Sequence, residues 1–223
     1  MGHPDEQSEE GSLRSFADAQ DDIIMITIID YGMGNLRSVQ KALEKFGAKT
    51  VITHDPQTIE QAGKVVLPGV GAIKPAMDRL TELNLVPAIK KVISADKPFL
   101  GICLGFQILF EQSNEGGNVK GLGILKGDVQ KFTHEKVPQI GWNQIKIQHK
   151  NDTLFRNIDD KSYVYFCHSY FVTSKDKDIV AAKTDYGVEY ASAVCRGNLW
   201  GVQFHPEKSQ TVGLKILENF VKI

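Results

Sequence analysis

The chain has 223 residues, of which 42% are hydrophobic and 24% are charged, and its formal net charge is −1. This composition is typical of a globular domain with a sizeable core. The balance of basic and acidic residues does not favour a nucleic acid or an anionic membrane surface as partner, and no apolar run approaches the roughly 20 residues that cross a bilayer.

Residues 1–24 differ from the rest of the chain, because they are rich in Asp and Glu and poor in large apolar side chains. They lack the basic start and apolar middle of a signal peptide. We interpret them as a disordered or loosely packed leader and place one domain at residues 25–223. Three cysteines without a secretory signal indicate reduced thiols and a cytoplasmic protein.

The first half of the domain alternates between strand and helix patterns. Asn35 can cap a helix that runs to about Phe46. The remaining patterns predict strands over 25–29, 49–53, 64–67 and 98–102, and helices over 72–83 and 86–94. The strand at 98–102 is apolar throughout, as expected for a strand buried on both faces. We therefore expect a three-layer α/β fold, in which helices flank a mainly parallel central sheet.

The second half changes character, because short extended segments follow one another with turn signals between them. A last helix is expected over 211–221. The extended segments are 142–148, 162–166, 170–173, 179–184, 189–195 and 199–204. Consecutive strands joined by short turns predict an antiparallel region added to the parallel sheet.

The motif Gly101-Ile102-Cys103-Leu104-Gly105 lies between the buried strand and a helix predicted over 106–111. This is the form of a nucleophile elbow, a sharp strand-to-helix turn in which side chains at positions 101 and 105 would clash. The turn places the thiol at a helix N-terminus, where the dipole favours the thiolate. Taken alone, the motif fits a buried and inert structural cysteine equally well.

A second segment supplies the base that a cysteine nucleophile needs. An apolar strand ends at His205, and Glu207 follows after Pro206. His205 can take and return the proton of the thiol, and Glu207 can orient the imidazole through its other nitrogen. Without the elbow, a surface histidine beside an acidic residue would be the plainer interpretation.

A third segment is the turn Pro68-Gly69-Val70-Gly71, which follows the strand at 64–67. Backbone N–H groups of such a turn can bind an oxyanion. Most glycine-rich turns only reverse the chain, so the signal depends on the turn lying beside the elbow. Because the carboxyl ends of parallel strands meet at one edge of a sheet, we expect this turn to lie beside the elbow.

With these three elements in order, the chain resembles the class I (triad) glutamine amidotransferases. Within them it is most similar to the family of glutaminase subunits of imidazole glycerol phosphate synthase, from histidine biosynthesis. The resemblance covers about 25–223 and rests on four segments: Asp30-Tyr31-Gly32-Met33-Gly34-Asn35-Leu36, the elbow extended to Gln107, Gly141-Trp142-Asn143, and His205-Pro206-Glu207-Lys208-Ser209-Gln210.

The resemblance implies that glutamine is hydrolysed by a triad of Cys103, His205 and Glu207. It further implies a site for the oxyanion and a site for the amino-acid end of glutamine, and it implies no metal or organic cofactor. The oxyanion would be held by backbone N–H groups at Val70, Gly71 and Leu104, and glutamine would be bound by Gln107, His168, Ser169 and Tyr170.

The resemblance also implies a partner, a TIM-barrel cyclase subunit that receives the ammonia in a heterodimer. Asn35, Trp142 and Lys208 are expected at the interface, although each also has an ordinary explanation as a helix cap, a core side chain or a solvated charge. We assign Cys167 and Cys195 to core packing.

Two other functions use the same chemistry. Paralogous amidotransferase subunits serve the amidation of sugars in surface polysaccharide synthesis, and the motifs separate them poorly from the histidine enzymes. A γ-glutamyl hydrolase would use the same Cys-His pair but would not need the segments around Asn35 and Lys208. A non-catalytic binding module would have no reason to combine Cys103, His205 and Glu207.

Overall fold

The computed structural model describes residues 24–133, 135–149 and 152–223. The leader expected at 1–24 lies outside the described residues except for Ile24, whose backbone oxygen accepts a hydrogen bond of 2.8 Å from Lys49 N–H. No helix in these described ranges has the length and apolar character needed to cross a membrane.

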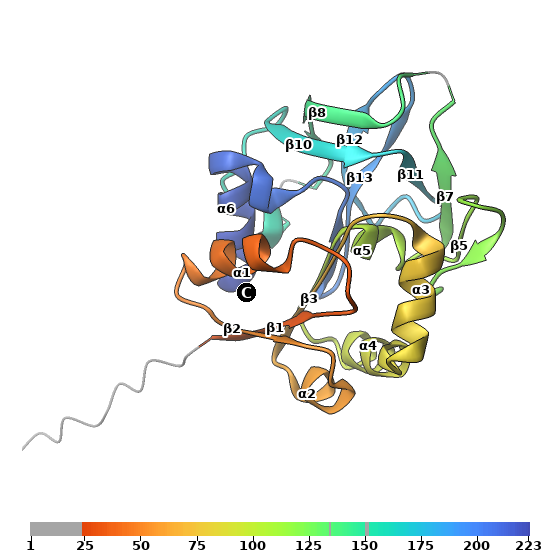
Figure 1. Ribbon diagram of the computed structural model, residues 1–223. Helices are drawn as coiled ribbons and strands as arrows, with labels where there is room; N and C mark the ends of the chain where they lie inside the picture. Colours follow the sequence, from red (N-terminus) through yellow and green to blue (C-terminus); the bar gives the residue numbers. More distant parts are fainter. Residues whose placement is uncertain (1–23, 134, 150–151) are drawn as a thin grey trace, which may run out of the picture.

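The first half forms a parallel sheet with crossover helices, as predicted (Figure 1). Its strands lie in the order β2-β1-β3-β4, and β14 (Leu199–Val202), from the second half of the chain, lies beside β4; every neighbouring pair is parallel. The elements of this part are β1 (Met25–Ile29), α1 (Leu36–Glu44), β2 (Lys49–Thr53), α2 (Pro56–Gln61), β3 (Lys64–Gly69), α3 (Ile73–Glu82), α4 (Leu85–Ser94), β4 (Phe99–Cys103) and α5 (Leu104–Gln107).

The second half extends this sheet with antiparallel strands and adds a separate two-stranded sheet, β8–β10. Strand β14 pairs with β13, β13 with β11, and β11 with β7, each antiparallel. The elements are β5 (Gln112–Ser113), β6 (Val119–Lys120), β7 (Gly127–Lys131), β8 (Gln139–Gln144), β9 (Lys146–Ile147), η1 (Thr153–Phe155), β10 (Tyr163–His168), β11 (Tyr170–Ser174), β12 (Val180–Asp185), β13 (Glu189–Arg196), β14 (Leu199–Val202), η2 (Pro206–Lys208) and α6 (Gln210–Val221).

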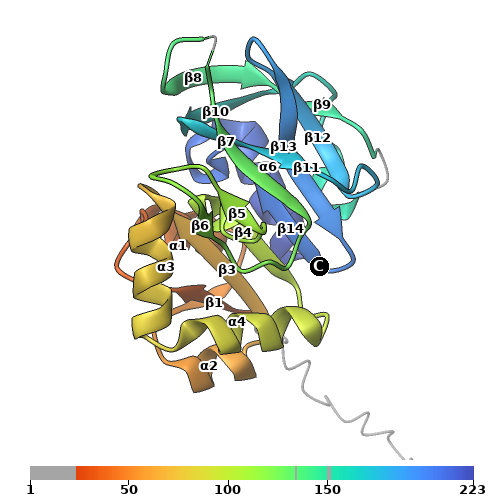
Figure 2. The same cartoon turned by 90° about the vertical axis from the view of Figure 1, so that its right-hand side faces the viewer.

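Helices cover both faces of the sheet and divide the core in two. Alternate residues of β4 face opposite ways: Leu100 and Ile102 pack under α1 and α6, whereas Phe99 packs under α3 and α4. Figure 1 shows α1 and α6 on one side of the sheet, and Figure 2 looks onto the side that carries α3 and α4. The predicted three-layer α/β class with an antiparallel addition is confirmed.

The helix predicted over 106–111 is wrong in its bounds, because α5 covers only Leu104–Gln107. The backbone oxygens that would continue it are already used: those of Ile108, Leu109 and Phe110 accept from Leu122, Leu125 and Gly123 at 2.7–3.1 Å. The chain therefore leaves the helix after one turn.

Candidate active site

Cys103 lies at the end of β4, in the middle of the parallel sheet. Its backbone has φ 54° and ψ −106°, a conformation that non-glycine residues rarely adopt and that must be held by surrounding structure. Strand β3 flanks β4 on one side and pairs Gly69 with Cys103, and β14 flanks it on the other and pairs Val202 with Ile102. The three sequence segments therefore meet at the carboxyl edge of the sheet.

The two glycines of the elbow are required by space. A Cβ atom at Gly105 would lie 1.8 Å from the backbone oxygen of Leu67, and one at Gly101 would lie 2.8 Å from the backbone oxygen of Gly105. Neither position could hold a side chain unless the backbone moved, which is the reason expected from the sequence.

His205 follows β14 and is 3% exposed. Its Nδ1 lies 2.9 Å from Glu207 Oε1, and both side chains are buried. Burial lowers the pKa of His205, but the hydrogen bonds and charges of Cys103 and Glu207 outweigh burial and raise this pKa to about 10. His205 is therefore an imidazolium at neutral pH, held between a sulfur and a carboxylate.

A cavity of about 470 Å³ opens beside Cys103. This volume is suited to a small molecule. The cavity brings together every predicted oxyanion and glutamine residue, whereas Asn35 and Trp142 do not line it. Its walls are formed by Val70, Gly71, Ala72, Cys103, Leu104, Gln107, Glu115, Pro138, Cys167, His168, Ser169, Tyr170, His205 and Lys208.

The predicted oxyanion residues lie on two elements of this wall. Val70 and Gly71 form the turn after β3, in which Gly71 has φ +95°, and Leu104 is the first residue of α5. Tyr31 lies directly beneath the turn, because a Cβ at Gly69 would meet its hydroxyl at 2.2 Å. Burial, followed by the charge of Cys103, raises the pKa of Tyr31, so its phenol stays protonated below this turn.

His168 is a wall residue and not a second base. Its Nδ1 donates to the Tyr170 carbonyl at 2.8 Å, and its Nε2 lies 3.2 Å from the hydroxyl of Tyr190. Burial lowers the pKa of His168 to about 4, so the ring is neutral. The aromatic rings of Phe132 and Phe166 pack against it in tilted orientations, with ring centroids 5.4 and 5.6 Å from that of the imidazole.

Glu115 is a wall residue that the motifs did not indicate. It lies in the loop between β5 and β6, and its Oε2 accepts from Ile73 N–H at 2.8 Å, at the start of α3. The sequence carries no motif at this position. It enters the site because the loop folds back against α3.

The predicted interface residues are exposed. Asn35 caps α1, since its side chain accepts from Ser38 N–H at 3.3 Å, as its position before the helix predicted. Trp142 is 45% exposed on β8 and packs edge-on against Tyr165 of β10. Lys208 is exposed at the mouth of the cavity.

The assignment of Cys167 to the core is wrong, because the side chain is exposed. Along β10, Val164, Phe166 and His168 face the core, so Cys167 in this alternating series faces outward. Cys195 is half-buried against the core, and burial raises the pKa of its thiol to about 12.

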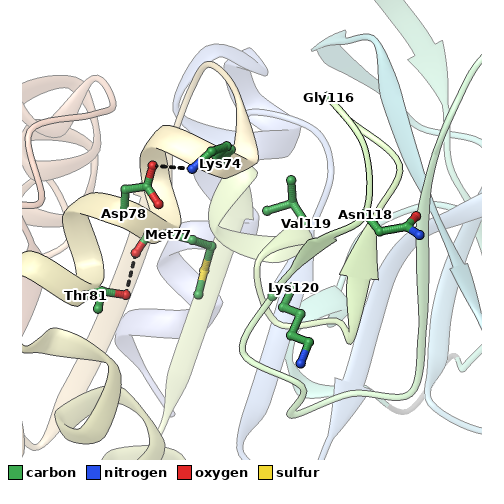
Figure 3. Close-up of a pocket in the computed structure, with 9 residues that line it drawn as sticks. Lys74, Met77, Asp78, Thr81, Gly116, Asn118, Val119 and Lys120 are labelled. Atoms are coloured by element: carbon green, nitrogen blue, oxygen red, sulfur yellow. Dashed lines mark hydrogen bonds and ion pairs between the residues drawn. The ribbon is translucent and has the colours of Figure 1, made fainter.

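A second hollow, of about 490 Å³, lies between α3 and the segment around β6 (Figure 3). On the α3 side of this hollow, Lys74 bonds to Asp78 at 2.9 Å, and the Thr81 hydroxyl donates to the Met77 carbonyl at 2.8 Å. It contains no cysteine or histidine. Size therefore does not identify the active site, whereas the chemistry of the cavity at Cys103 does.

Comparison with known proteins agrees with this geometry. The family model for glutamine amidotransferase class-I matches residues 27–223. The imidazole glycerol phosphate synthase subunit HisH of Syntrophotalea carbinolica is 50% identical over 204 residues, covering 88% of this chain and 98% of the relative. The subunit of the same name from Methanocaldococcus jannaschii is 50% identical over 200 residues, covering 89% of this chain and all of the relative.

Solved structures share the fold at lower identity. PurLQS from Thermotoga maritima has a TM-score of 0.70 at 20% identity and covers 89% of this chain and 97% of that chain. The glutaminase domain of Trypanosoma brucei CTPS with bound acivicin has a TM-score of 0.65 at 14% identity, covering 89% of this chain and 91% of that chain.

Proposed function

This chain belongs to the class I glutamine amidotransferase family, and within it to the HisH subunits, and from that premise we propose that it is the glutaminase subunit of imidazole glycerol phosphate synthase. It hydrolyses glutamine to glutamate and ammonia. The ammonia passes to a cyclase subunit, which forms imidazole glycerol phosphate and aminoimidazole carboxamide ribonucleotide in histidine biosynthesis. The observation that best supports this proposal is that Cys103, His205 and the glycine turn line one cavity, in a chain that is 50% identical to such a subunit.

The proposed reaction begins with attack of the Cys103 sulfur on the side-chain carbonyl of glutamine. Backbone N–H groups at Val70, Gly71 and Leu104 stabilise the tetrahedral oxyanion. His205 is protonated before the reaction, so it can donate its proton to the departing ammonia. His205 then takes a proton from water, which hydrolyses the glutamyl thioester, releases glutamate and restores the Cys103 sulfur.

Glu207 has an orienting role in this scheme. Its Oε1 accepts from His205 Nδ1, which leaves Nε2 to face the sulfur. The buried carboxylate also stabilises the positive charge on the ring.

The amino-acid end of glutamine is proposed to lie against Gln107, Ser169 and Tyr170, with the carboxylate of Glu115 facing its α-ammonium group. Glu115→Gln separates this role from the hydrogen bond at the start of α3, because the amide oxygen of the substituted side chain can still accept from Ile73 N–H. Loss of one hydrogen bond to a charged group costs about 1.5–3 kcal/mol, so KM for glutamine should rise at least about tenfold with kcat little changed. An unchanged KM would remove Glu115 from the substrate site.

The partner surface is proposed to be the outer face of the β8–β10 sheet. Large hydrophobic side chains at Ile140, Trp142 and Tyr163 are 61%, 45% and 55% exposed there. Exposed apolar side chains gathered on one face mark an interaction site, and aromatic anchors carry much of the energy of such interfaces. A TIM-barrel cyclase covering this face, with contacts at Asn35 and Lys208, would also shield ammonia from bulk water.

The proposed compartment is the cytoplasm. The mechanism needs a reduced thiol at Cys103, and all three cysteines of the chain are free. The scheme uses side chains and backbone N–H groups alone, so no metal or organic cofactor enters it. Within the described ranges, no three His, Cys, Asp or Glu side chains are grouped so as to hold a metal ion.

The test is glutamate formation by the chain alone, with the cyclase subunit, and with the cyclase subunit plus its nucleotide ligand. Low basal activity that rises strongly with the liganded partner is the expected result. Full activity of the isolated chain would contradict the coupling, and no activity in any mixture would contradict the glutaminase assignment.

A further inference from the structure

Behind the active-site wall, a chain of buried amides connects a backbone carbonyl to the nucleophile. The carbonyl of Tyr170 can only accept, and Gln107 Nε2 lies 2.8 Å from it. This contact fixes which end of the Gln107 amide is nitrogen. The second hydrogen of the same nitrogen is directed at Gln203 Oε1, 2.9 Å away.

The orientation of Gln203 follows from that of Gln107. Because its oxygen accepts from Gln107, its Nε2 must point the other way, and it lies 3.7 Å from Cys103 Sγ. Gln203 is completely buried. The backbone N–H of Gln203 donates to the Ser192 carbonyl at 2.9 Å, so the backbone that carries this side chain is also held in place.

We propose that Gln203 is a positioning residue for the nucleophile: its amide N–H, aimed through Gln107 by the Tyr170 carbonyl, holds the Cys103 sulfur in the thiolate form and toward the cavity. An N–H donor stabilises a thiolate more than a thiol, because the hydrogen bond to a charged acceptor is the stronger one. This role rests on the proposed function, in which Cys103 is the nucleophile.

The other groups near the Cys103 sulfur do not replace this donor. The backbone oxygen of Cys167 lies 4.0 Å from the sulfur and can only accept a hydrogen bond. His205 supplies the opposite charge, and its proton leaves toward ammonia during the reaction. Burial, followed by the charge of Cys103, raises the pKa of Tyr31, whose hydroxyl has no hydrogen-bond partner among the described residues. Burial also raises the pKa of Tyr190, although its hydrogen bonds lower it, and its hydroxyl donates to Gln139 Oε1 at 3.0 Å rather than to the sulfur. Gln203 carries no charge and does not titrate, so it donates to the sulfur at every stage.

The arrangement also connects the substrate wall to the nucleophile. Gln107 and Tyr170 line the cavity, whereas Gln203 lies behind it. Binding of the substrate at Gln107 would therefore restrict the motion of the Gln107 amide, and with it that of the Gln203 amide. Sequence inspection did not indicate Gln203, because only the side-chain geometry shows which way its amide points.

The test measures the thiolate directly and does not need turnover. Alkylation of Cys103 by iodoacetamide is followed across pH in the full chain by mass spectrometry of the Cys103 peptide, in a Cys167→Val background that removes the exposed thiol. Gln203→Met keeps the volume and removes the donor, and Gln203→Glu keeps the shape and adds a negative charge. Ser192→Ala is the matched control, since its buried hydroxyl has no partner among the described residues.

The pH midpoint of Cys103 alkylation should rise by about one unit in Gln203→Met, a tenfold change that corresponds to about 1.4 kcal/mol. It should rise further in Gln203→Glu and stay unchanged in Ser192→Ala. A midpoint in Gln203→Met equal to that of the unsubstituted protein would overturn the proposal. A raised midpoint in a chain without glutaminase activity would instead overturn the proposed function and leave the role of Gln203 standing.

A measurement on the unsubstituted chain decides the matter if either variant fails to fold. The side-chain amide resonance of Gln203 in nitrogen-15 spectra should shift across pH with the same midpoint as Cys103 alkylation. It should also move when Cys103 is alkylated. An amide resonance that shifts neither with pH nor on alkylation of Cys103 would show that no hydrogen bond to the sulfur exists.

Discussion

Gly105→Ala tests whether the elbow is fixed by space alone. A Cβ at this position would lie 1.8 Å from the Leu67 backbone oxygen, more than 1 Å closer than real Cβ contacts, which essentially never fall below 3.0 Å. Leu67 belongs to β3 and is paired with Gly101 of β4, so neither the obstacle nor the elbow is free to move alone. Overpacking lowers stability by about 1–3 kcal/mol, and Gly105→Ala should lie at the upper end, at about 3 kcal/mol, because the atom it meets belongs to the backbone.

Urea denaturation measures this loss as a lower midpoint at constant slope. Partner-stimulated glutaminase activity should fall about a hundredfold or more, because a displacement of about 1 Å at a reacting group has that effect. Gly63→Ala is the matched control, since a Cβ there meets nothing within 4 Å, and its stability should stay within about 0.5 kcal/mol. A Gly105→Ala chain with the stability of the control and full activity would refute the spatial explanation.

Three further predictions follow from the site. Glu207→Gln removes a charge that raises the pKa of His205, so this pKa should fall and kcat should drop about ten- to hundredfold, as a pH–rate profile would show; an unchanged profile would remove Glu207 from the triad. The folded-state pKa of His168 is lowered to about 4, so its contribution to stability is complete above pH 6.5 and is lost as pH falls toward 4. The free energy of unfolding, measured with urea, should therefore fall by about 3 kcal/mol over this pH interval relative to that of His168→Gln. Free energies of unfolding that change in parallel with pH in the two proteins would contradict the burial argument. Trp142→Ala should weaken binding of the cyclase subunit at least about tenfold in calorimetric titration without changing basal glutaminase activity, and unchanged affinity would place the interface elsewhere.

The sequence predicted the parallel half of the fold well, because each strand ends at a glycine or proline turn and each long helix carries a clear apolar face. It missed α2 (Pro56–Gln61), although Asp55 caps this helix and Pro56 starts it, since six residues carry too little periodicity. It also missed β7 (Gly127–Lys131), a strand with only two buried residues.

The candidate site was predicted where topology alone determines proximity. Cys103 and Gly69 end two neighbouring parallel strands and His205 follows a third, so their meeting is a consequence of the strand order. Glu115 was not predictable, because its position depends on a loop folding against α3. Cys167 was misassigned, because the alternation of β10 decides its direction and the sequence does not mark where that strand joins the core.

Glutamate formation by the Cys103→Ala chain, assembled with the cyclase subunit and its nucleotide ligand, tests the central claim most directly. The substitution removes the sulfur and leaves His205, the oxyanion turn and the cavity in place. With folding verified by an unchanged urea midpoint, turnover should fall by at least about a thousandfold, because no other group can form the thioester. Turnover within tenfold of the unsubstituted chain would contradict the account of Cys103 as the nucleophile that releases ammonia from glutamine.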